Sequence, residues 1–74
     1  MKATFASDRS DGPVICIHFK ESERSNAEKV GQWLIDTYGF EWIHEEDDLM
    51  TVGIVGYTIA ELREYWKEAK EATK

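Results

Sequence analysis

Cysteine is nearly absent from this 74-residue sequence, in which Cys16 is the one thiol. A single cysteine cannot form an internal disulfide, and it excludes the zinc clusters that need several thiolates. Disulfides belong mainly to oxidising compartments, so this composition suits a reducing cytosol. We therefore expect a fold that is stabilised by its apolar core and not by covalent cross-links.

Long hydrophobic runs are also absent. The longest uninterrupted apolar run is residues 14–17, far short of the roughly 20 residues that span a bilayer. Residues 1–12 contain Lys2 but no long apolar stretch after it, unlike a secretory signal peptide. We expect a cytoplasmic protein that does not bind membranes.

Lysine and arginine are missing from residues 30–62, which contain seven acidic residues. This segment has a charge of −7, whereas the remaining residues carry eight acids and nine bases, so the net charge is −6. Such a segment repels polyanions, because affinity for nucleic acid depends on cations that neutralise phosphates. We expect no direct binding to nucleic acid.

The overall composition of the chain is typical of a small globular protein. Hydrophobic residues make up 42% of the chain and charged residues 32%, with three each of Trp, Tyr and Phe. This length predicts a single domain over residues 1–74. A core of this size typically leaves a net stability of about 3–5 kcal/mol, so self-association is an alternative to an isolated monomer.

Two pairs of strands are predicted. Residues 13–20 are rich in β-branched and aromatic residues and follow a turn-forming segment, which predicts a strand paired with a shorter one at residues 2–5. The two-residue period of a strand assigns to one face Ile15, Ile17 and Phe19, and to the other Val14, Cys16, His18 and Lys20. Residues 40–44 and 49–56 predict a second pair.

The first predicted helix covers residues 25–39. Ser25 is followed three residues later by Glu28, which is the pattern of a capping box, and Gly39 suits the left-handed position after a helix. Trp33 lies beside the apolar stripe and should be half covered. The stripe itself, at helical spacing, consists of Ala27, Val30, Gly31, Leu34 and Tyr38.

The second predicted helix covers residues 57–74. Thr58 and Glu61 form another capping box, while Tyr57 and Leu62 occupy the positions of a hydrophobic staple. Its narrow apolar seam consists of Ile59, Leu62, Trp66, Ala69 and Thr73. The order strand–strand–helix, repeated, predicts an α+β two-layer sandwich (ββαββα): a four-stranded, mainly antiparallel sheet with both helices on one face.

Four consecutive acids, Glu45, Glu46, Asp47 and Asp48, form the tip of the second predicted hairpin. The conservative interpretation is a solvated turn that also keeps the sheet edge from pairing with other chains. A calcium site needs six to eight oxygens, usually from alternating positions around a sharp glycine turn. The tip has neither feature, so we expect no metal there.

A zinc site would use Cys16 and His18, which share one face of a strand, with His44 as the third ligand. However, His44 shares its face with Phe40 and Trp42, and no pattern in the sequence brings it beside His18. The paired ligand spacings typical of zinc proteins are absent. We expect no bound metal.

Covalent catalysis has little support either. Cys16 is placed mid-strand and not at a helix N-terminus, where its thiolate would be stabilised. Residues 53–58 contain two glycines before a helix but lack the lysine and the spacing of a phosphate-binding loop. We expect no enzymatic activity, no catalytic residues and no cofactor.

Aromatic residues are frequent in the same acidic segment, residues 30–62. The base-free segment contains Trp33, Tyr38, Phe40, Trp42 and Tyr57, and with Tyr65 and Trp66 these exceed what so small a core should bury fully. Partly exposed aromatics are typical anchors of protein interfaces, and an acidic rim steers a basic partner. The leading hypothesis is a regulatory or inhibitory protein-binding module, in which the four acids of the tip steer a basic partner protein and Trp33 or Trp42 anchors it.

Two alternatives remain open. The carboxylates could imitate phosphates and so inhibit a protein that binds DNA or RNA. The second alternative is a structural homodimer, because one face of the sheet has no helix left to cover it. That face should carry Val14, Cys16 and His18, together with Thr51, Gly53 and Val55.

Overall fold

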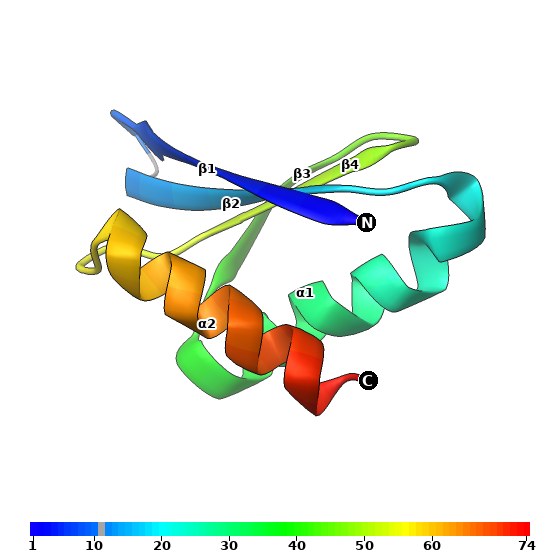
Figure 1. The fold of residues 1–74 in the computed structure, drawn as a ribbon. Helices are drawn as coiled ribbons and strands as arrows, with labels where there is room; N and C mark the ends of the chain where they lie inside the picture. The colour runs from blue at the N-terminus through cyan, green and yellow to red at the C-terminus, as the bar shows by residue number, and fades with distance from the viewer. Residues whose placement is uncertain (11) are drawn as a thin grey trace.

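A computed structural model describes residues 1–10 and 12–74 of the chain. Its elements follow the order ββαββα, with one turn of 3-10 helix before the first α-helix (Figure 1). Their bounds are β1 (Lys2–Asp8), β2 (Gly12–His18), η1 (Glu21–Glu23), α1 (Arg24–Tyr38), β3 (Glu41–Glu45), β4 (Leu49–Gly53) and α2 (Ile59–Ala72).

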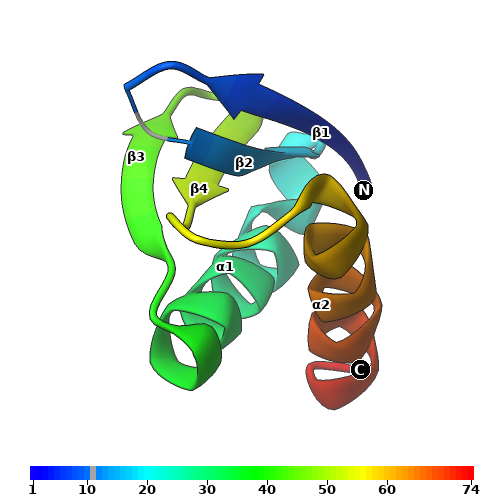
Figure 2. The same cartoon turned by 90° about the vertical axis from the view of Figure 1, so that its left-hand side faces the viewer.

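The four strands form one antiparallel sheet in the order β1-β2-β4-β3. Both helices lie on the same side of this sheet, and no helix of the described residues covers its other side (Figures 1 and 2). The structure is therefore the predicted α+β arrangement. Strand order, which the sequence left undetermined, makes β1 and β3 the two edges of the sheet.

The core lies between the sheet and the two helices. Ile15, Ile17 and Phe19 are buried, as the period of the strand predicts. The core side chains of the other elements are Ala27, Val30 and Leu34 of α1, Phe40, Met50 and Val52 of the β3–β4 region, and Leu62, Trp66 and Ala69 of α2. Alternation in the strands and helical spacing in α1 and α2 thus converge on a single core.

The predicted boundary of the fourth strand was wrong. β4 ends at Gly53, so Val55 does not lie in the sheet. The N–H of Ile54 still donates to the carbonyl of Pro13 at 3.2 Å, and the chain then turns through Gly56, whose φ of 95° favours glycine. The first strand is longer than the predicted residues 2–5, because β1 remains paired with β2 as far as Asp8, which lies opposite Gly12.

The predicted start of the first helix was also wrong. α1 begins at Arg24 and its N-cap residue is Glu23, which makes no side-chain capping bond. The carboxylate of Glu23 instead accepts from the N–H of Lys20 at 2.9 Å and closes the turn η1. Because η1 leads directly into α1, Ser25 lies inside the helix and cannot cap it.

The capping residues at the end of α1 and at the start of α2 were predicted correctly, although α2 (Ile59–Ala72) is shorter at both ends than the predicted helix over residues 57–74. Gly39 ends α1 with a φ of 81°, and its N–H donates to the carbonyl of Ile35 at 3.0 Å. At the start of α2, the N–H of Glu61 donates to Oγ1 of Thr58 at 3.2 Å, and the N–H of Thr58 donates to the Glu61 carboxylate at 2.9 Å. This is a complete capping box.

Candidate functional site

The edge strand β3 carries the exposed Trp42 and leads directly into the acidic run of residues 45–48. A bulge between Trp42 and His44 interrupts its pairing with β4. Trp42 lies opposite Val52 on the helix side of the sheet, whereas His44 lies opposite Thr51 on the open side. Residues two apart in a regular strand share a face, so the bulge is what separates Trp42 from His44, which the sequence pattern places on the same face.

Trp42 is half exposed and rests against α1. Its side chain is 38% exposed, the largest value for an aromatic residue among the exposed large hydrophobics. A Cβ atom built on Gly31 would lie 3.1 Å from Cζ3 of the indole, so the absence of a side chain at Gly31 lets the ring lie against the helix. The result is an aromatic surface that is fixed on one side and open to solvent on the other.

The acidic tip, residues 45–48, is tied to the start of α1. Arg24 donates to the Glu45 carboxylate at 3.0 Å and to the carbonyl of Asp47 at 2.7 Å. The hairpin is closed by the N–H of Glu46, which donates to the carbonyl of Leu49 at 2.7 Å. Glu45 thus belongs to an ion pair, and the more freely solvated acids of the tip are Glu46, Asp47 and Asp48.

Arg24 is a residue of the candidate site that the sequence did not indicate. It lies outside the base-free segment, yet folding places its guanidinium among acidic side chains. The hydrogen bond that it donates to Glu21, followed by the charges of Glu21, Glu45 and Glu28, holds the pKa of Arg24 above its usual value. Only the packing of the hairpin onto the start of α1 could have revealed the contact with the tip.

Trp33 and Trp42 do not share a surface. Trp33 packs edge-on against Tyr38 at a centroid distance of 5.8 Å, and Tyr38 stacks on Tyr65 of α2 at 3.9 Å. Positions 31 and 33 of a helix are about 200° apart around its axis, because each residue turns it by about 100°. Trp33 therefore lies toward α2, on the other side of α1 from Trp42.

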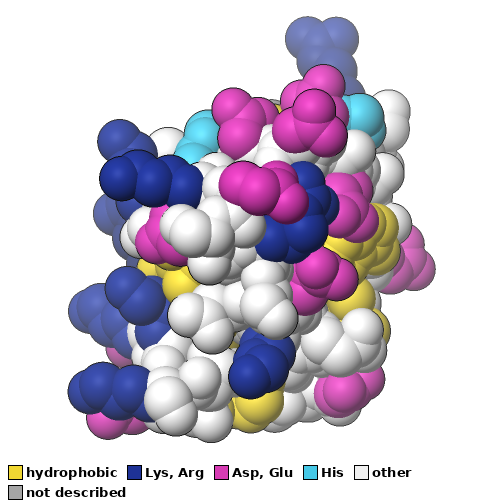
Figure 3. All heavy atoms as spheres, turned by 90° about the vertical axis from the view of Figure 1, so that its right-hand side faces the viewer, with side chains coloured by type: hydrophobic (Ala, Val, Ile, Leu, Met, Phe, Trp, Pro, Cys, Tyr) yellow, Lys and Arg dark blue, Asp and Glu magenta, His cyan; other side chains and the backbone are white. Residues whose placement is uncertain are grey.

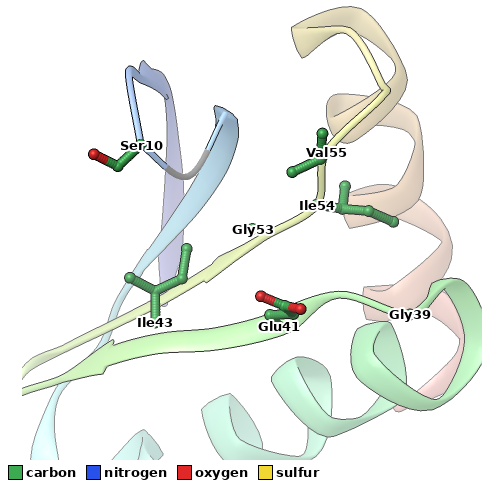
Figure 4. A pocket seen from close by; sticks show the side chains of 7 residues that line it. All are labelled: Ser10, Gly39, Glu41, Ile43, Gly53, Ile54 and Val55. Atoms are coloured by element: carbon green, nitrogen blue, oxygen red, sulfur yellow. The ribbon is translucent and has the colours of Figure 1, made fainter.

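A pocket of about 280 Å³ lies beside β3 on the open side of the sheet (Figure 4). Its lining includes Ile43, Gly53, Val55 and the carboxylate-bearing Glu41, with Ser10 from the β1–β2 turn. Figure 4 shows Ile43 and Val55 on either side of the space, with Glu41 turned toward β4. No sequence pattern indicated this pocket, because its walls come from separate segments of the chain.

The predicted dimer face exists only in part. Val14 is 6% exposed, since Ile43 reaches across Gly53 toward it, and Val55 is 77% exposed beyond the end of β4. Cys16 is half-buried and accepts a weak hydrogen bond from Thr51 Oγ1 at 3.9 Å. The exposed His18 ring lies 3.0 Å from the Thr4 hydroxyl. These four residues therefore do not form one continuous apolar patch.

The fold does not bring the ligands of the zinc and calcium alternatives close together. Cys16 and His44 both lie opposite Thr51, on strands either side of β4, which separates them by about 10 Å across the sheet. Within residues 1–10 and 12–74, no group of three or more His, Cys, Asp or Glu side chains could hold a metal ion.

Comparisons with known proteins give no match: no family model fits the chain, and it resembles no curated protein and no solved structure. None of the helices in the described part of the chain is long and apolar enough to cross a membrane.

Proposed function

We propose that this protein is a non-enzymatic binding module that uses β3 and the acidic tip to engage a basic surface on another protein. The observation that carries the proposal is the position of Trp42. An aromatic ring on an edge strand, 38% exposed and supported from beneath by Gly31, has the properties of an interface anchor.

The acidic residues around Trp42 favour a partner with a basic surface. Glu41 and Glu45 flank Trp42 along β3, and the rest of the acidic tip follows directly. Figure 3 shows carboxylates gathered at the top of the molecule, over the end of the β3–β4 hairpin, whereas Lys and Arg side chains lie along the edge over β1 and α2. An acidic surface of this kind accelerates encounter with a basic partner.

The pocket beside β3 supports the same choice of partner. Its volume of about 280 Å³ and its lining of Ile43, Val55 and Glu41 suit a lysine or arginine side chain. The aliphatic stem of such a residue would contact the two apolar side chains, and its charged end would meet the carboxylate. Glu41 and Trp42 would then hold the partner from opposite faces of β3.

The test begins with capture of partners from a native lysate of the source organism, followed by binding measurements with the purified partner at low and high salt. One variant removes three charges from the tip (Glu46→Gln, Asp47→Asn and Asp48→Asn) and spares Glu45, whose ion pair with Arg24 supports the fold. A matched control removes three exposed charges from the helices: Asp36→Asn, Glu64→Gln and Glu71→Gln.

We expect the tip variant to lose about tenfold in affinity at low salt and little at high salt, because exposed charges are screened. Trp42→Ala should cost about thirtyfold at either salt concentration, as for an interface hot spot of about 2 kcal/mol. Equal losses in the tip variant and its control, or an unaffected Trp42→Ala, would contradict the proposal. Competition by duplex DNA for the same partner would identify the partner's basic surface as a nucleic-acid site.

A further inference from the structure

The second edge of the sheet, β1, leaves one side of its backbone unpaired. β1 is seven residues long, and among the strands of the described residues it pairs with β2 alone. An extended peptide can add to such an edge through main-chain hydrogen bonds, while its alternate side chains enter neighbouring pockets. β1 and β3 form opposite edges of the sheet, so a ligand on β1 is independent of the basic partner proposed for β3.

A groove runs beside this edge, between β1 and α2. Its volume is about 390 Å³, and we call it the β1–α2 groove. It is lined by Phe5 of β1 and by Ala60, Arg63, Glu64, Trp66 and Lys67 of α2. Phe5 belongs to the helix side of β1, so a strand added at this edge would direct every second side chain into the groove.

The groove is lined by two cations, Arg63 and Lys67, and one carboxylate, Glu64. The guanidinium of Arg63 lies 5.6 Å from the centre of the Phe5 ring, and the ammonium of Lys70 lies 5.9 Å from that of Trp66. No carboxylate of the described residues forms an ion pair with Arg63, whereas Lys67 pairs with Glu64 at 3.6 Å on the exposed surface. In Figure 3, Lys and Arg side chains predominate along the left-hand edge, with some carboxylates between them.

We propose that the β1–α2 groove binds an extended acidic segment of another protein, which adds as a fifth strand antiparallel or parallel to β1. Apolar side chains of this segment would contact Phe5 and Trp66. Its carboxylates would meet Arg63, Lys67 and Lys70. A basic segment would bring like charges together at this rim.

A second copy of the chain, joined through β1 of each, fits less well. Symmetric pairing of two β1 edges would place the cations of α2 from both copies along the same seam, where they repel. The acidic edge strand β3 of another copy has the right charge, but a head-to-tail contact of this kind does not close between two copies and would build a ring or a filament.

The test uses seven-residue synthetic peptides, matched in length to β1, that alternate Glu with Val, Leu or Phe and carry blocked, fluorescently labelled ends. The control peptides replace each Glu by Lys. Binding is measured by fluorescence anisotropy at low salt, and its location by shifts of the backbone amide signals in two-dimensional NMR spectra. The variant Arg63→Gln with Lys67→Gln is compared with Lys20→Gln and Lys29→Gln, which removes two exposed charges elsewhere.

We expect the acidic peptides to bind and to shift the amides of β1 and of the first half of α2. The groove variant should weaken their binding about tenfold, from the loss of two charge contacts, and the control variant should not. Absence of binding at about 1 mM peptide, equal binding of the Lys peptides, or shifts confined to β3 would overturn the proposal. So would concentration-dependent self-association in sedimentation that the groove variant abolishes, because the occupant would then be a second copy.

Discussion

At the scale of single residues, two glycines lie against large side chains of β3, and the space around each differs. A Cβ added to Gly53 would lie 2.6 Å from Cδ1 of Ile43, 3.0 Å from Cγ1 of Val14 and 3.2 Å from the backbone carbonyl of Pro13. A Cβ added to Gly31 would meet only the Trp42 ring, at 3.1 Å. One site is closed on several sides, and the other is closed by a side chain that is free to move outward.

Gly53→Ala should therefore destabilise the protein by about 1–3 kcal/mol, the usual cost of overpacking. Gly31→Ala should be neutral or stabilise by up to about 1 kcal/mol, because alanine is favoured over glycine within a helix and Trp42 can yield by a few tenths of an ångström. Urea denaturation followed by circular dichroism measures both changes. Adding Ile43→Val to Gly53→Ala, which removes the closest atom, should restore part of the loss, and no restoration would contradict this account of the clash.

Tyr38 titrates abnormally for a half-buried tyrosine. Its hydroxyl donates to the Glu68 carboxylate at 2.7 Å, which with desolvation raises the pKa of Tyr38 to about 12. The folded protein thus holds this proton more tightly than the unfolded chain. The stability that this bond contributes is complete below about pH 10 and is lost as the pH rises toward 12.

We expect an ultraviolet titration of the folded protein to show one tyrosine that ionises near pH 12. Glu68→Gln should lower the pKa of Tyr38 toward about 10, because the charge that holds the proton is gone. The control Glu71→Gln removes an exposed charge of the same helix and should leave it unchanged. An unaltered titration in Glu68→Gln would contradict the assignment.

At the scale of the elements, the two helices begin in different ways. α2 starts with a capping box in which both hydrogen bonds are made, whereas the similar pattern at Ser25 and Glu28 falls inside α1. The turn η1 accounts for the difference, because it starts the helical path of the chain at Glu21, ahead of any side-chain cap at Ser25. A capping-box pattern therefore predicts the start of a helix only where the residues before it are not already helical.

Thr58→Ala should lower the free energy of unfolding by about 1 kcal/mol, the usual cost of losing an N-cap. Ser25→Ala should change it by less than about 0.5 kcal/mol, since alanine is a good residue within a helix. Chemical denaturation of the two variants beside the wild type makes the comparison. A larger loss in Ser25→Ala would mean that α1 starts where the sequence pattern places it.

At the scale of the whole molecule, one small core carries most of the stability. Leu34, Met50 and Leu62 are fully buried and come from three different elements. The net stability expected for a chain of this size is about 3–5 kcal/mol, whereas truncation of a buried leucine costs about 2–5 kcal/mol. The net stability of the protein and the cost of one cavity in its core are therefore of similar size.

Leu34→Ala should leave much of the protein unfolded at 25 °C, which far-ultraviolet circular dichroism and thermal melting would report. Val55→Ala changes a residue that is 77% exposed, and this variant should have the same melting temperature as the wild type. Cooperative folding of Leu34→Ala with an unchanged melting temperature would show that stability comes from elsewhere, for example from association between chains.

Much of the fold followed from local patterns, whereas the candidate site did not. Alternation identified Ile15, Ile17 and Phe19 as core residues, and helical spacing identified Val30 and Leu34, because burial of apolar area is the main favourable term in folding. The predicted partner-binding residues were separated by the structure: the acidic tip and Trp42 lie along β3, while Trp33 lies toward α2.

By itself, then, the sequence determined the type and order of the elements, the faces they bury and the excess of acid in one segment. These properties depend on residues close together in the chain and on the fixed periods of helix and strand. Only the tertiary structure decided that β1 and β3 are the edges of the sheet, that Arg24 meets the acidic tip, and that cations and aromatics line a groove beside β1. Such contacts join segments far apart in the chain, and their geometry exists only once the core has packed.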